Sequence, residues 1–301
     1  MKKYDVIIIG GGPGGYSAAL YAARAGLSTL VIEKMSVGGQ MALTSEIENY
    51  PGIDKIDGFS LGMNMQASAE RFGAVTEYGE VEGVEVDGEN KRVLLSGGEM
   101  REARNLVIAT GASPRLLGIP GEAELTGAGV HYCAHCDGRF YEGRTVAVIG
   151  GGNSAVGDAA YLARLAKRVI LIHRRDELRA TRVEAERLAS HSNVEYKWNA
   201  SPIAVEQKNE SLTLSLIKKD GAREDIEVDG VFVSIGREPE SRLFRHLVDV
   251  DEGGYIIADE STRTSVPGIY AGGDVRTKAL RQIITAAADG ATAAHMIESE
   301  M

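Results

Sequence analysis

Two cysteines separated by two residues are the most reactive feature of the sequence. Cys133-Ala134-His135-Cys136 is a C-x-x-C motif, and the chain has no other cysteine. A thiolate attacks a disulfide, and a second thiol nearby closes the ring and releases the product, so this spacing favours a redox dithiol. A zinc site and an inert buried pair stay open, although zinc needs further ligands at spacings that the chain does not offer. Haem attachment is excluded, because position 137 is aspartate and not histidine.

The residues around this motif suggest one proton donor. Asp137 follows the second cysteine directly, where a carboxylic acid can protonate a leaving thiolate. The pair Asp137-Gly138 is also typical of a simple turn, so a structural role stays open. We expect His131 and His135 to be solvated loop residues, and we predict no metal ligands.

Two glycine-rich turns repeat along the chain. Gly10-Gly11-Gly12-Pro13-Gly14-Gly15 follows the apolar segment 4–9, and Gly150-Gly151-Gly152-Asn153-Ser154-Ala155 follows the apolar segment 145–149. In each copy a small-residue segment with helical character and then another apolar segment follow. Glycine permits the tight turn and the close approach of a pyrophosphate, which then meets the N-terminus of the helix. The repeat therefore predicts two dinucleotide-binding units.

The residue that ends the second strand differs between the copies. Glu33 stands in the first copy and suits a ribose 2′-hydroxyl group. His173-Arg174-Arg175, with Arg179 one turn further on, stands in the second copy and suits a 2′-phosphate. Two charge-assisted contacts of about 1.5–3 kcal/mol each would favour NADPH over NADH by roughly 10²–10⁴. Surface positions for Glu33 and for the arginines remain the alternatives. Two nicotinamides have no hydride chemistry to share, so one nucleotide should be a flavin.

The remaining segments predict the architecture. After each unit come short strands with Asp-Gly type turns: residues 74–86 and 91–95 in the first half, and 193–204, 211–217 and 224–228 in the second. We predict an α/β protein of two Rossmann-like domains, each a parallel sheet with a three-stranded antiparallel flap. Residues 254–257 and 268–271 should be further strands, and 281–297 the closing helix.

Charge and composition narrow the partners. The 301 residues include 33 basic and 43 acidic side chains, a net charge of −10, which argues against nucleic acid and anionic membranes. No apolar run is long enough to span a membrane. With only two cysteines, we expect a cytoplasmic protein.

Together these motifs resemble the low-molecular-weight, bacterial-type thioredoxin reductases. The resemblance covers essentially the whole chain and includes Gly39-Gln40, Ala109-Thr110-Gly111 and Gly272-Gly273-Asp274 in the family's order. It implies an FAD-binding domain of residues 1–113 and 241–301, with an NADPH-binding domain of residues 114–240 inserted. It also implies a homodimer, and thioredoxin or a thioredoxin-like small protein as the partner.

The resemblance further assigns roles to individual residues. Cys136 would face the flavin, Cys133 would attack the thioredoxin disulfide, and Asp137 would be the acid. The residues implied for FAD are Gly10, Gly11, Gly12, Pro13, Gly14, Glu33, Lys34, Gly39, Gln40, Asn49, Val81, Ala109, Thr110, Gly111, Gly273, Asp274, Arg281, Gln282 and Ile283. Those implied for NADPH are Gly152, Asn153, Ser154, Ala155, His173, Arg174, Arg175, Arg179 and Ile235.

The sequence leaves two other functions open on the same scaffold. A dithiol oxidase would pass the electrons to oxygen. A nucleotide-sensing protein would hold both nucleotides without using its thiols.

Overall fold

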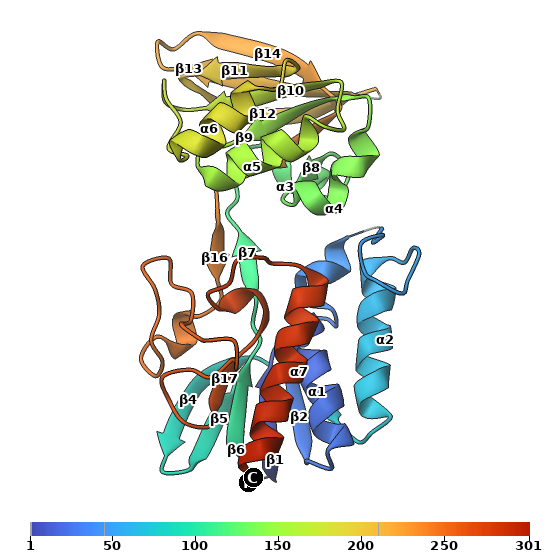
Figure 1. Cartoon of the computed structure of the whole chain (residues 1–301), viewed down its shortest axis with the longest axis vertical. Coiled ribbons are helices and arrows are strands. Elements are labelled where there is room, and N and C mark those ends of the chain that lie inside the picture. The colour runs from blue at the N-terminus through green and yellow to red at the C-terminus, as the bar shows by residue number, and fades with distance from the viewer. Residues whose placement is uncertain (1, 45, 210) are drawn as a thin grey trace. The chain divides into compact units, whose positions relative to one another are not determined.

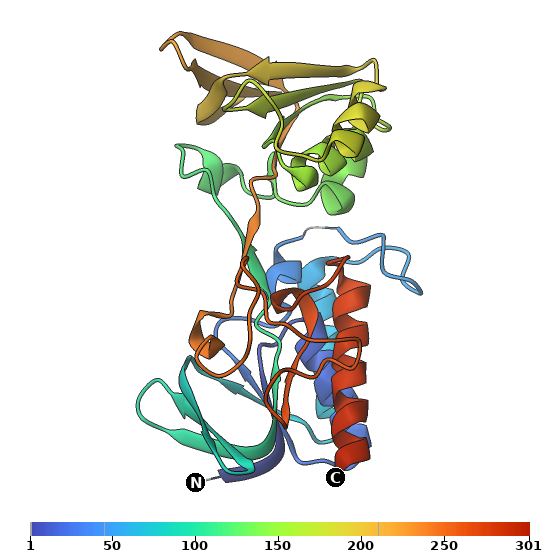
Figure 2. The same ribbon diagram turned by 60° about the vertical axis from the view of Figure 1, so that its left-hand side comes forward.

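The computed structural model describes residues 2–44, 46–209 and 211–301 and divides the chain into two compact units. Unit 1 combines the residues up to Ser113 with Glu238–Met301, and unit 2 is Pro114–Arg237. Figures 1 and 2 show the two units from two sides. The second division falls at 237, a little before the expected 240. Among the described residues, no helix is long and apolar enough to cross a membrane.

A mostly parallel sheet forms the centre of unit 1. Its parallel strands are β1 (Lys2–Ile9), β2 (Thr29–Glu33), β3 (Val75–Tyr78), β6 (Met100–Ile108) and β17 (Ile269–Ala271), and β4 (Val81–Asp87) and β5 (Asn90–Leu95) continue it antiparallel from β6. Val6–Ile9 is buried on both faces, as expected for a strand covered by helices or loops on each side. The carboxyl ends of β1, β2 and β6 therefore meet at one edge of the sheet.

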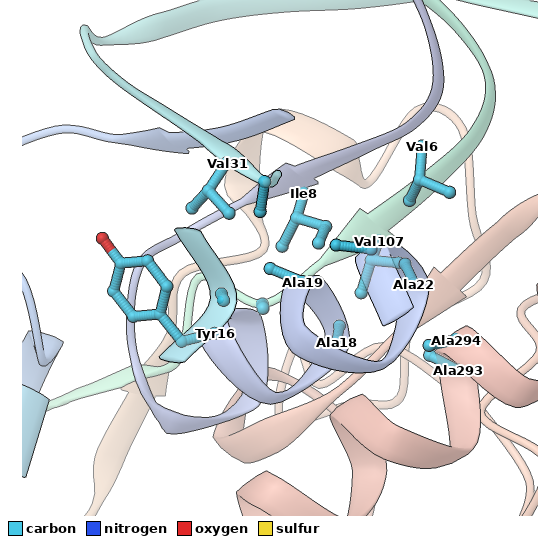
Figure 3. Packing of buried hydrophobic residues seen from close by; sticks show 14 of the residues in the cluster. Val6, Ile8, Tyr16, Ala18, Ala19, Ala22, Val31, Val107, Ala293 and Ala294 are labelled. Atoms are coloured by element: carbon cyan, nitrogen blue, oxygen red, sulfur yellow. The ribbon is translucent and has the colours of Figure 1, made fainter. Parts of the chain in front are cut away.

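Helices rich in small residues cover one face of this sheet. They are α1 (Pro13–Arg24), α2 (Gly58–Glu70) and α7 (Ile283–Glu300). The 3₁₀ turns of unit 1 are η1 (Gly39–Leu43), η3 (Arg242–Phe244) and η4 (Gly273–Val275), and Phe244 and Val275 pack on the opposite face with Ile7 and Ile9. Ala18, Ala19 and Ala22 of α1 pack between the strands and the alanines of α7 (Figure 3). The small side chains let α1 lie close to both neighbours. A Cβ on Gly290 of α7 would meet the carbonyl oxygen of Gly14 in α1.

Unit 2 repeats this plan with a separate flap. Its parallel sheet has the order β11 (Val194–Trp198), β10 (Arg168–His173), β9 (Thr145–Ile149), β15 (Gly230–Val233) and β8 (Val130–His131). The flap is an antiparallel sheet of β12 (Ala200–Lys208), β13 (Ser211–Lys218) and β14 (Arg223–Val228). The helical segments are α3 (Glu122–Leu125), α4 (Ala134–Asp137), η2 (Gly138–Tyr141), α5 (Asn153–Leu162) and α6 (Arg182–Ala189).

Two short strands connect the units. β7 (Ala112–Pro114) leads out of unit 1 and β16 (Arg237–Pro239) leads back, and the two pair with each other. The N–H of Glu240 donates to the carbonyl oxygen of Gly111 at 3.0 Å. Ser113 and Glu238, where the two segments of unit 1 end and begin, therefore lie close together in space.

The predicted fold class is confirmed, with corrections to single elements. The first segment of the predicted flap, β3, pairs parallel with β2 and so belongs to the main sheet. The strand expected at 254–257 is absent: Ile256 makes only single bridges to Val250 and Arg276. The segment is apolar because it is a loop that buries Ile256 completely in the core. The helices begin at Pro13 and Ile283, because proline is favoured in a first turn and Gln282 caps α7.

Candidate functional site

The two cysteines form a disulfide at the start of a short helix in unit 2. Cys133 is the N-cap of α4, and the Cα atoms of Cys133 and Cys136 lie 5.3 Å apart. The N–H groups of Cys136 and Asp137 donate to the carbonyl oxygen of Cys133, which fixes this turn. Both cysteines are partly exposed, unlike an inert buried pair. Among the described residues, no group of three or more His, Cys, Asp or Glu side chains could hold a metal.

Asp137 lies beside a buried histidine. The Nδ1 atom of His131 is 3.3 Å from the Oδ2 atom of Asp137, and its Nε2 atom is 2.7 Å from the hydroxyl oxygen of Tyr141. The His131 ring stacks on Phe232, with the centroids 5.3 Å apart. Only 6% of His131 is exposed, so the expectation of a solvated loop residue is wrong. Strand β8 carries this histidine into the interior, where it pairs in register with Phe232 of β15.

His135, inside the motif, lies in a different environment. Its side chain is 54% exposed and stacks on Tyr161 of α5, and its Nδ1 atom is 3.9 Å from the Oδ1 atom of Asp158. Burial raises the pKa of Asp158, against the effect of the hydrogen bond that the Ser234 hydroxyl donates to it at 2.6 Å. Nothing in the sequence around the C-x-x-C motif indicated Asp158, because it lies on the next helix, α5.

The first glycine turn forms an open cradle at the edge of the unit 1 sheet. Gly10 has a φ of +108°, and a Cβ there would collide with the backbone of Ala109. The N–H of Gly11 donates to the Oε2 atom of Glu33 at 2.6 Å. No side chain caps α1 at Gly12, and a Cβ on Gly12 would meet nothing closer than 4.0 Å. The free space and the uncapped helix N-terminus fit a pyrophosphate group.

Several segments far apart in the chain converge on this cradle. Ala109 donates its N–H to Ile9, at the end of the adjacent strand, and the Thr110 hydroxyl donates to the carbonyl oxygen of Glu240. The side-chain amide of Asn49 donates to Gln282 at 3.2 Å. A Cβ on Gly14 would lie 3.6 Å from the nitrogen of Gly273, so the residues before Asp274 adjoin the first turn of α1.

The other residues implied for FAD come from several elements of unit 1, and a Cβ on Gly39 would lie 3.6 Å from the Cα atom of Gly12. Arg281 folds back on its own unit, with its guanidinium group 4.1 Å from the centroid of the Tyr255 ring. Lys34 is exposed and pairs with Glu80 at 2.7 Å. Gly39 and Gln40 belong to η1, Gly111 has a φ of +76°, Val81 begins β4, Pro13 begins α1 and Ile283 begins α7.

The second glycine turn forms a similar cradle in unit 2. The loop after β10 is fastened to it: Arg179 and Ala180 donate their N–H groups to Gly151, and Thr181 donates to the side chain of Asn153. A Cβ on Gly152 would meet only Nη2 of Arg179, at 3.9 Å. An open space therefore has a guanidinium group at its edge, which fits an anionic nucleotide.

The basic residues surround a buried imidazole at this cradle. His173 is buried against Gly151, and its Nε2 atom has no hydrogen-bond partner in the described structure. Burial lowers the pKa of His173, and the nearby Arg179, Arg175 and Arg174 lower it further. All three arginines are exposed. Ser154 and Ala155 lie in the first turn of α5, and Ile235 follows β15.

Two nucleotide cradles and a partly exposed disulfide define a disulfide oxidoreductase linked to dinucleotide cofactors. The family model described as pyridine nucleotide-disulphide oxidoreductase matches residues 4–290. The thioredoxin reductase of Listeria monocytogenes is 46% identical over 294 residues, covering 97% of this chain and 92% of that protein. That of Bacillus subtilis is 44% identical, covering 99% and 94%.

Solved structures agree with these relatives. Thioredoxin reductase from Streptococcus pyogenes has a TM-score of 0.92 at 43% identity, covering 98% of this chain and 97% of that one. The enzyme from Giardia duodenalis has a TM-score of 0.93 at 32% identity, covering 99% of each chain. The chain therefore belongs to the pyridine nucleotide-disulphide oxidoreductase family, and within it to the thioredoxin reductases. The expected cofactors, FAD and NADPH, and the redox use of the cysteine pair are confirmed with it.

Proposed function

We propose that this chain reduces the disulfide of thioredoxin, or of a thioredoxin-like small protein, with electrons from NADPH that pass through FAD to Cys133 and Cys136. The partly exposed disulfide in α4, in the same unit as the basic nucleotide cradle, is the observation that supports this most directly. Bound FAD supplies the two-electron carrier between the nicotinamide and the sulfur pair.

Unit 1 is the proposed FAD-binding domain. The backbone of Gly10–Gly14, with Pro13 in the first helical turn, would hold the pyrophosphate against the N-terminus of α1. Glu33 would accept hydrogen bonds from the ribose hydroxyl groups. Its two carboxylate oxygens already accept from the N–H groups of Gly11 and Met35 and have further lone pairs available. The remainder of the FAD site would be lined by Thr110, Asp274 and the Asn49–Gln282 pair, together with the other residues that the resemblance implies for FAD.

Unit 2 is the proposed NADPH-binding domain. Gly152 and the first turn of α5 would hold the pyrophosphate, and Arg174, Arg175 and Arg179 would bind the 2′-phosphate. His173 would lie behind the glycine turn that holds the nucleotide, since its ring is buried against Gly151.

The thiol chemistry follows from the order of the cysteines. In the reduced enzyme the Cys133 thiolate attacks one sulfur of the partner disulfide, and the displaced partner thiolate takes a proton from Asp137. The Cys136 thiolate then attacks Cys133 and displaces the second partner thiolate, which takes up the proton that Cys136 released. The partner gains two electrons and two protons, and the enzyme disulfide is restored.

Single substitutions of the cysteines and Asp137 test these roles. Cys136→Ser should abolish thioredoxin reduction, while NADPH still bleaches the flavin absorbance. Asp137→Asn should retain both flavin reduction and disulfide reduction within the enzyme, and should slow transfer to thioredoxin. NADPH oxidation with oxygen alone, and none with any thioredoxin of the host, would instead support an oxidase. Full function in Cys136→Ser would support a nucleotide sensor.

We also propose that two copies of the chain associate through unit 1. Helices α1, α2 and α7 lie side by side (Figure 1). An apolar groove between them is lined by Tyr16, Leu20, Tyr21, Leu61, Met65 and Ile284. Tyr21 and Ile284 are 48% and 41% exposed, and monomers rarely leave such patches uncovered. Analytical ultracentrifugation should give the mass of a dimer for the native chain and of a monomer for Tyr21→Glu/Ile284→Glu. A native monomer at micromolar concentration would contradict this proposal.

The proposed location is the cytoplasm. The only two cysteines form one working pair, whose reduction needs a supply of NADPH and a reducing compartment. Fractionation of the host cell with an antibody against the chain tests this directly.

A further inference from the structure

The side chains of His131, Asp137 and Tyr141 form a continuous array beside the disulfide. They come from β8 and α4 (Figure 1) and from η2, which follows α4 directly in the chain. Asp137 adjoins Cys136 in the chain, its carboxylate is 3.3 Å from Nδ1 of His131, and the Tyr141 hydroxyl is 2.7 Å from Nε2. Both ring nitrogens of one buried imidazole are therefore engaged, one by a carboxyl group and one by a phenol.

The fold makes room for this arrangement. The Tyr141 ring meets the edges of both His131 and Phe232, and a Cβ on Gly230 would collide with it. Burial raises the pKa of Tyr141 to about 12, so its hydroxyl keeps its proton at neutral pH. A neutral hydroxyl group can donate to an unprotonated Nε2 and accept from a protonated one.

We propose that His131, held by the Tyr141 hydroxyl, is a positioning residue for Asp137: its Nδ1–H fixes the orientation of the carboxyl group and stabilises the carboxylate that remains when the proton goes to the leaving thiolate. The inference rests on the proposed role of Asp137 as the acid. It adds the side chains that hold that acid in place.

The proton balance of the array is simple. Before transfer, the Asp137 carboxyl group carries the proton, the neutral His131 ring donates its Nδ1–H to Oδ2, and the Tyr141 hydroxyl donates to Nε2. When the displaced thiolate takes the carboxyl proton, the carboxylate still accepts the Nδ1–H and the Tyr141 hydroxyl still donates to Nε2. Solvent then restores the lost proton through the partly exposed Asp137. The array thus keeps every polar atom bonded in both states, which a buried carboxyl–imidazole pair alone would not.

The charged groups that act on the array can be named. Asp137 of α4, Arg144 and Asp229 act on Tyr141. His135 and Asp158 lie at α4 and α5, and β15 contributes the uncharged Phe232. A change in pH dependence must therefore be compared with substitutions of these neighbours.

The test uses the complete FAD-loaded enzyme and variants that preserve ring packing. His131→Phe keeps a stacked ring but removes both nitrogens, Tyr141→Phe removes only the hydroxyl, and His131→Gln restores one donor. Tyr196→Phe is the matched control, because Tyr196 stacks on Trp198 elsewhere in unit 2. Two quantities are measured: kcat and KM for thioredoxin, and the rate at which iodoacetamide alkylates the reduced cysteines as a function of pH.

We expect kcat to fall at least about 10-fold in His131→Phe with KM for thioredoxin little changed, since general acid catalysis contributes about 10²–10⁴-fold and positioning is part of it. Tyr141→Phe should lose less, His131→Gln should recover part, and Tyr196→Phe should match the native enzyme. The pH profile of alkylation should lose the same step in His131→Phe and in Asp137→Asn.

The outcomes separate the inference from the function on which it rests. Native kcat and a native alkylation profile in His131→Phe and Tyr141→Phe, with both changed in Asp137→Asn, would overturn the role of His131 alone. Native behaviour in Asp137→Asn as well would overturn the proposed acid. If His131→Phe does not fold, Tyr141→Phe decides, because it removes a single oxygen atom.

Discussion

Arg174, Arg175 and Arg179 follow a strand that ends in a buried histidine. Backbone N–H groups of the loop that carries them donate to the carbonyl oxygen of Gly151 and to the side chain of Asn153, so the loop stays at the nucleotide cradle although the arginine side chains are exposed. An anion bound there gains charge-assisted contacts without the cost of ordering the loop.

Replacing two of these arginines should change the preference between nucleotides. We expect Arg174→Ala/Arg175→Ala to weaken NADP⁺ binding by roughly 10²–10⁴ and NAD⁺ binding far less, since only the former carries the 2′-phosphate. Isothermal titration calorimetry measures both. Arg182→Ala is the control, because Arg182 is 90% exposed and pairs with Glu186 on α6. Equal losses for the two nucleotides would mean that these side chains do not recognise the phosphate.

His173 should make the stability of unit 2 sensitive to acid. Its pKa is lowered in the folded chain, first by burial, so the unfolded chain binds a proton at a higher pH than the folded chain does. Stability from this residue is therefore complete above about pH 6.5 and declines as the pH falls, by at most about 1.4 kcal/mol per pH unit. Hydrogen exchange of β9 and β10 amides between pH 5 and 7.5, without nucleotide, measures it. His173→Phe, which keeps a ring without a titrating group, should show a flatter dependence, and an unchanged slope would refute this assignment.

The sequence predicted the residues whose chemistry depends on local spacing. The C-x-x-C pair and the two glycine turns are short motifs, and each forms the expected local structure. The burial of His131 depends instead on Phe232, a hundred positions away on the neighbouring strand, so local sequence could not reveal it. The one available signal was Val130, an apolar residue directly before His131 that allows a short strand.

Helices α1 and α7 depend on glycine for their close packing. Both are rich in alanine, and α7 passes Gly290 directly over the backbone of Gly14. This contact sets the distance between two helices that also carry the first glycine turn and the Gln282 cap.

Alanine substitutions at two helical glycines should have opposite effects. Gly290→Ala should destabilise unit 1 by about 1–3 kcal/mol, because the new methyl group meets backbone that cannot move aside without separating the helices. Gly157→Ala in α5, where a Cβ meets nothing within 4 Å, should instead stabilise unit 2 by about 0.5–1 kcal/mol. Urea unfolding followed by circular dichroism compares the two. A neutral Gly290→Ala would mean that the helices can repack.

At the scale of elements, the sequence predicted the strand–turn–helix units better than it predicted which sheet each further strand joins. Runs such as Val6–Ile9 and Val146–Ile149 are buried on both faces, and their apolar pattern requires that. The pairing of β3 with β2 and the loop around Ile256 depend on which neighbour lies beside each segment. An apolar residue in a buried loop has the same pattern as one in a strand, which explains the wrong prediction at 254–257.

Each unit of the molecule has hydrophobic cores of its own. The clusters around Ile8 and Leu106 contain only unit 1 residues, and those around Val148 and Leu214 contain only unit 2 residues. The paired strands β7 and β16 hold the two chain segments of unit 1 together where the inserted unit begins and ends. There the N–H of Glu240 donates to the carbonyl oxygen of Gly111.

Unit 1 should therefore fold when unit 2 is removed. We expect a chain in which a short glycine linker replaces Pro114–Arg237 to unfold cooperatively and to be purified yellow with bound FAD, without oxidising NADPH. The absorption spectrum and thermal unfolding measure this. A colourless, unfolded product would show that unit 1 needs unit 2 in order to fold. The isolated Pro114–Arg237 segment can be tested in the same way for NADP⁺ binding.

The insertion of one unit into the other also determines the order in which they can form on the ribosome. Residues up to Ser113 emerge first, yet β17 and α7, which complete their sheet and cover α1, emerge last. Unit 2 is finished in the interval, so it can fold while the alanine-rich face of α1 still lacks its helical partner. A nascent chain arrested after Arg237 should thus protect unit 2 from protease while the earlier segment is still cleaved. During that interval the segment up to Ser113 exposes the apolar face of α1, and we expect it to bind a chaperone.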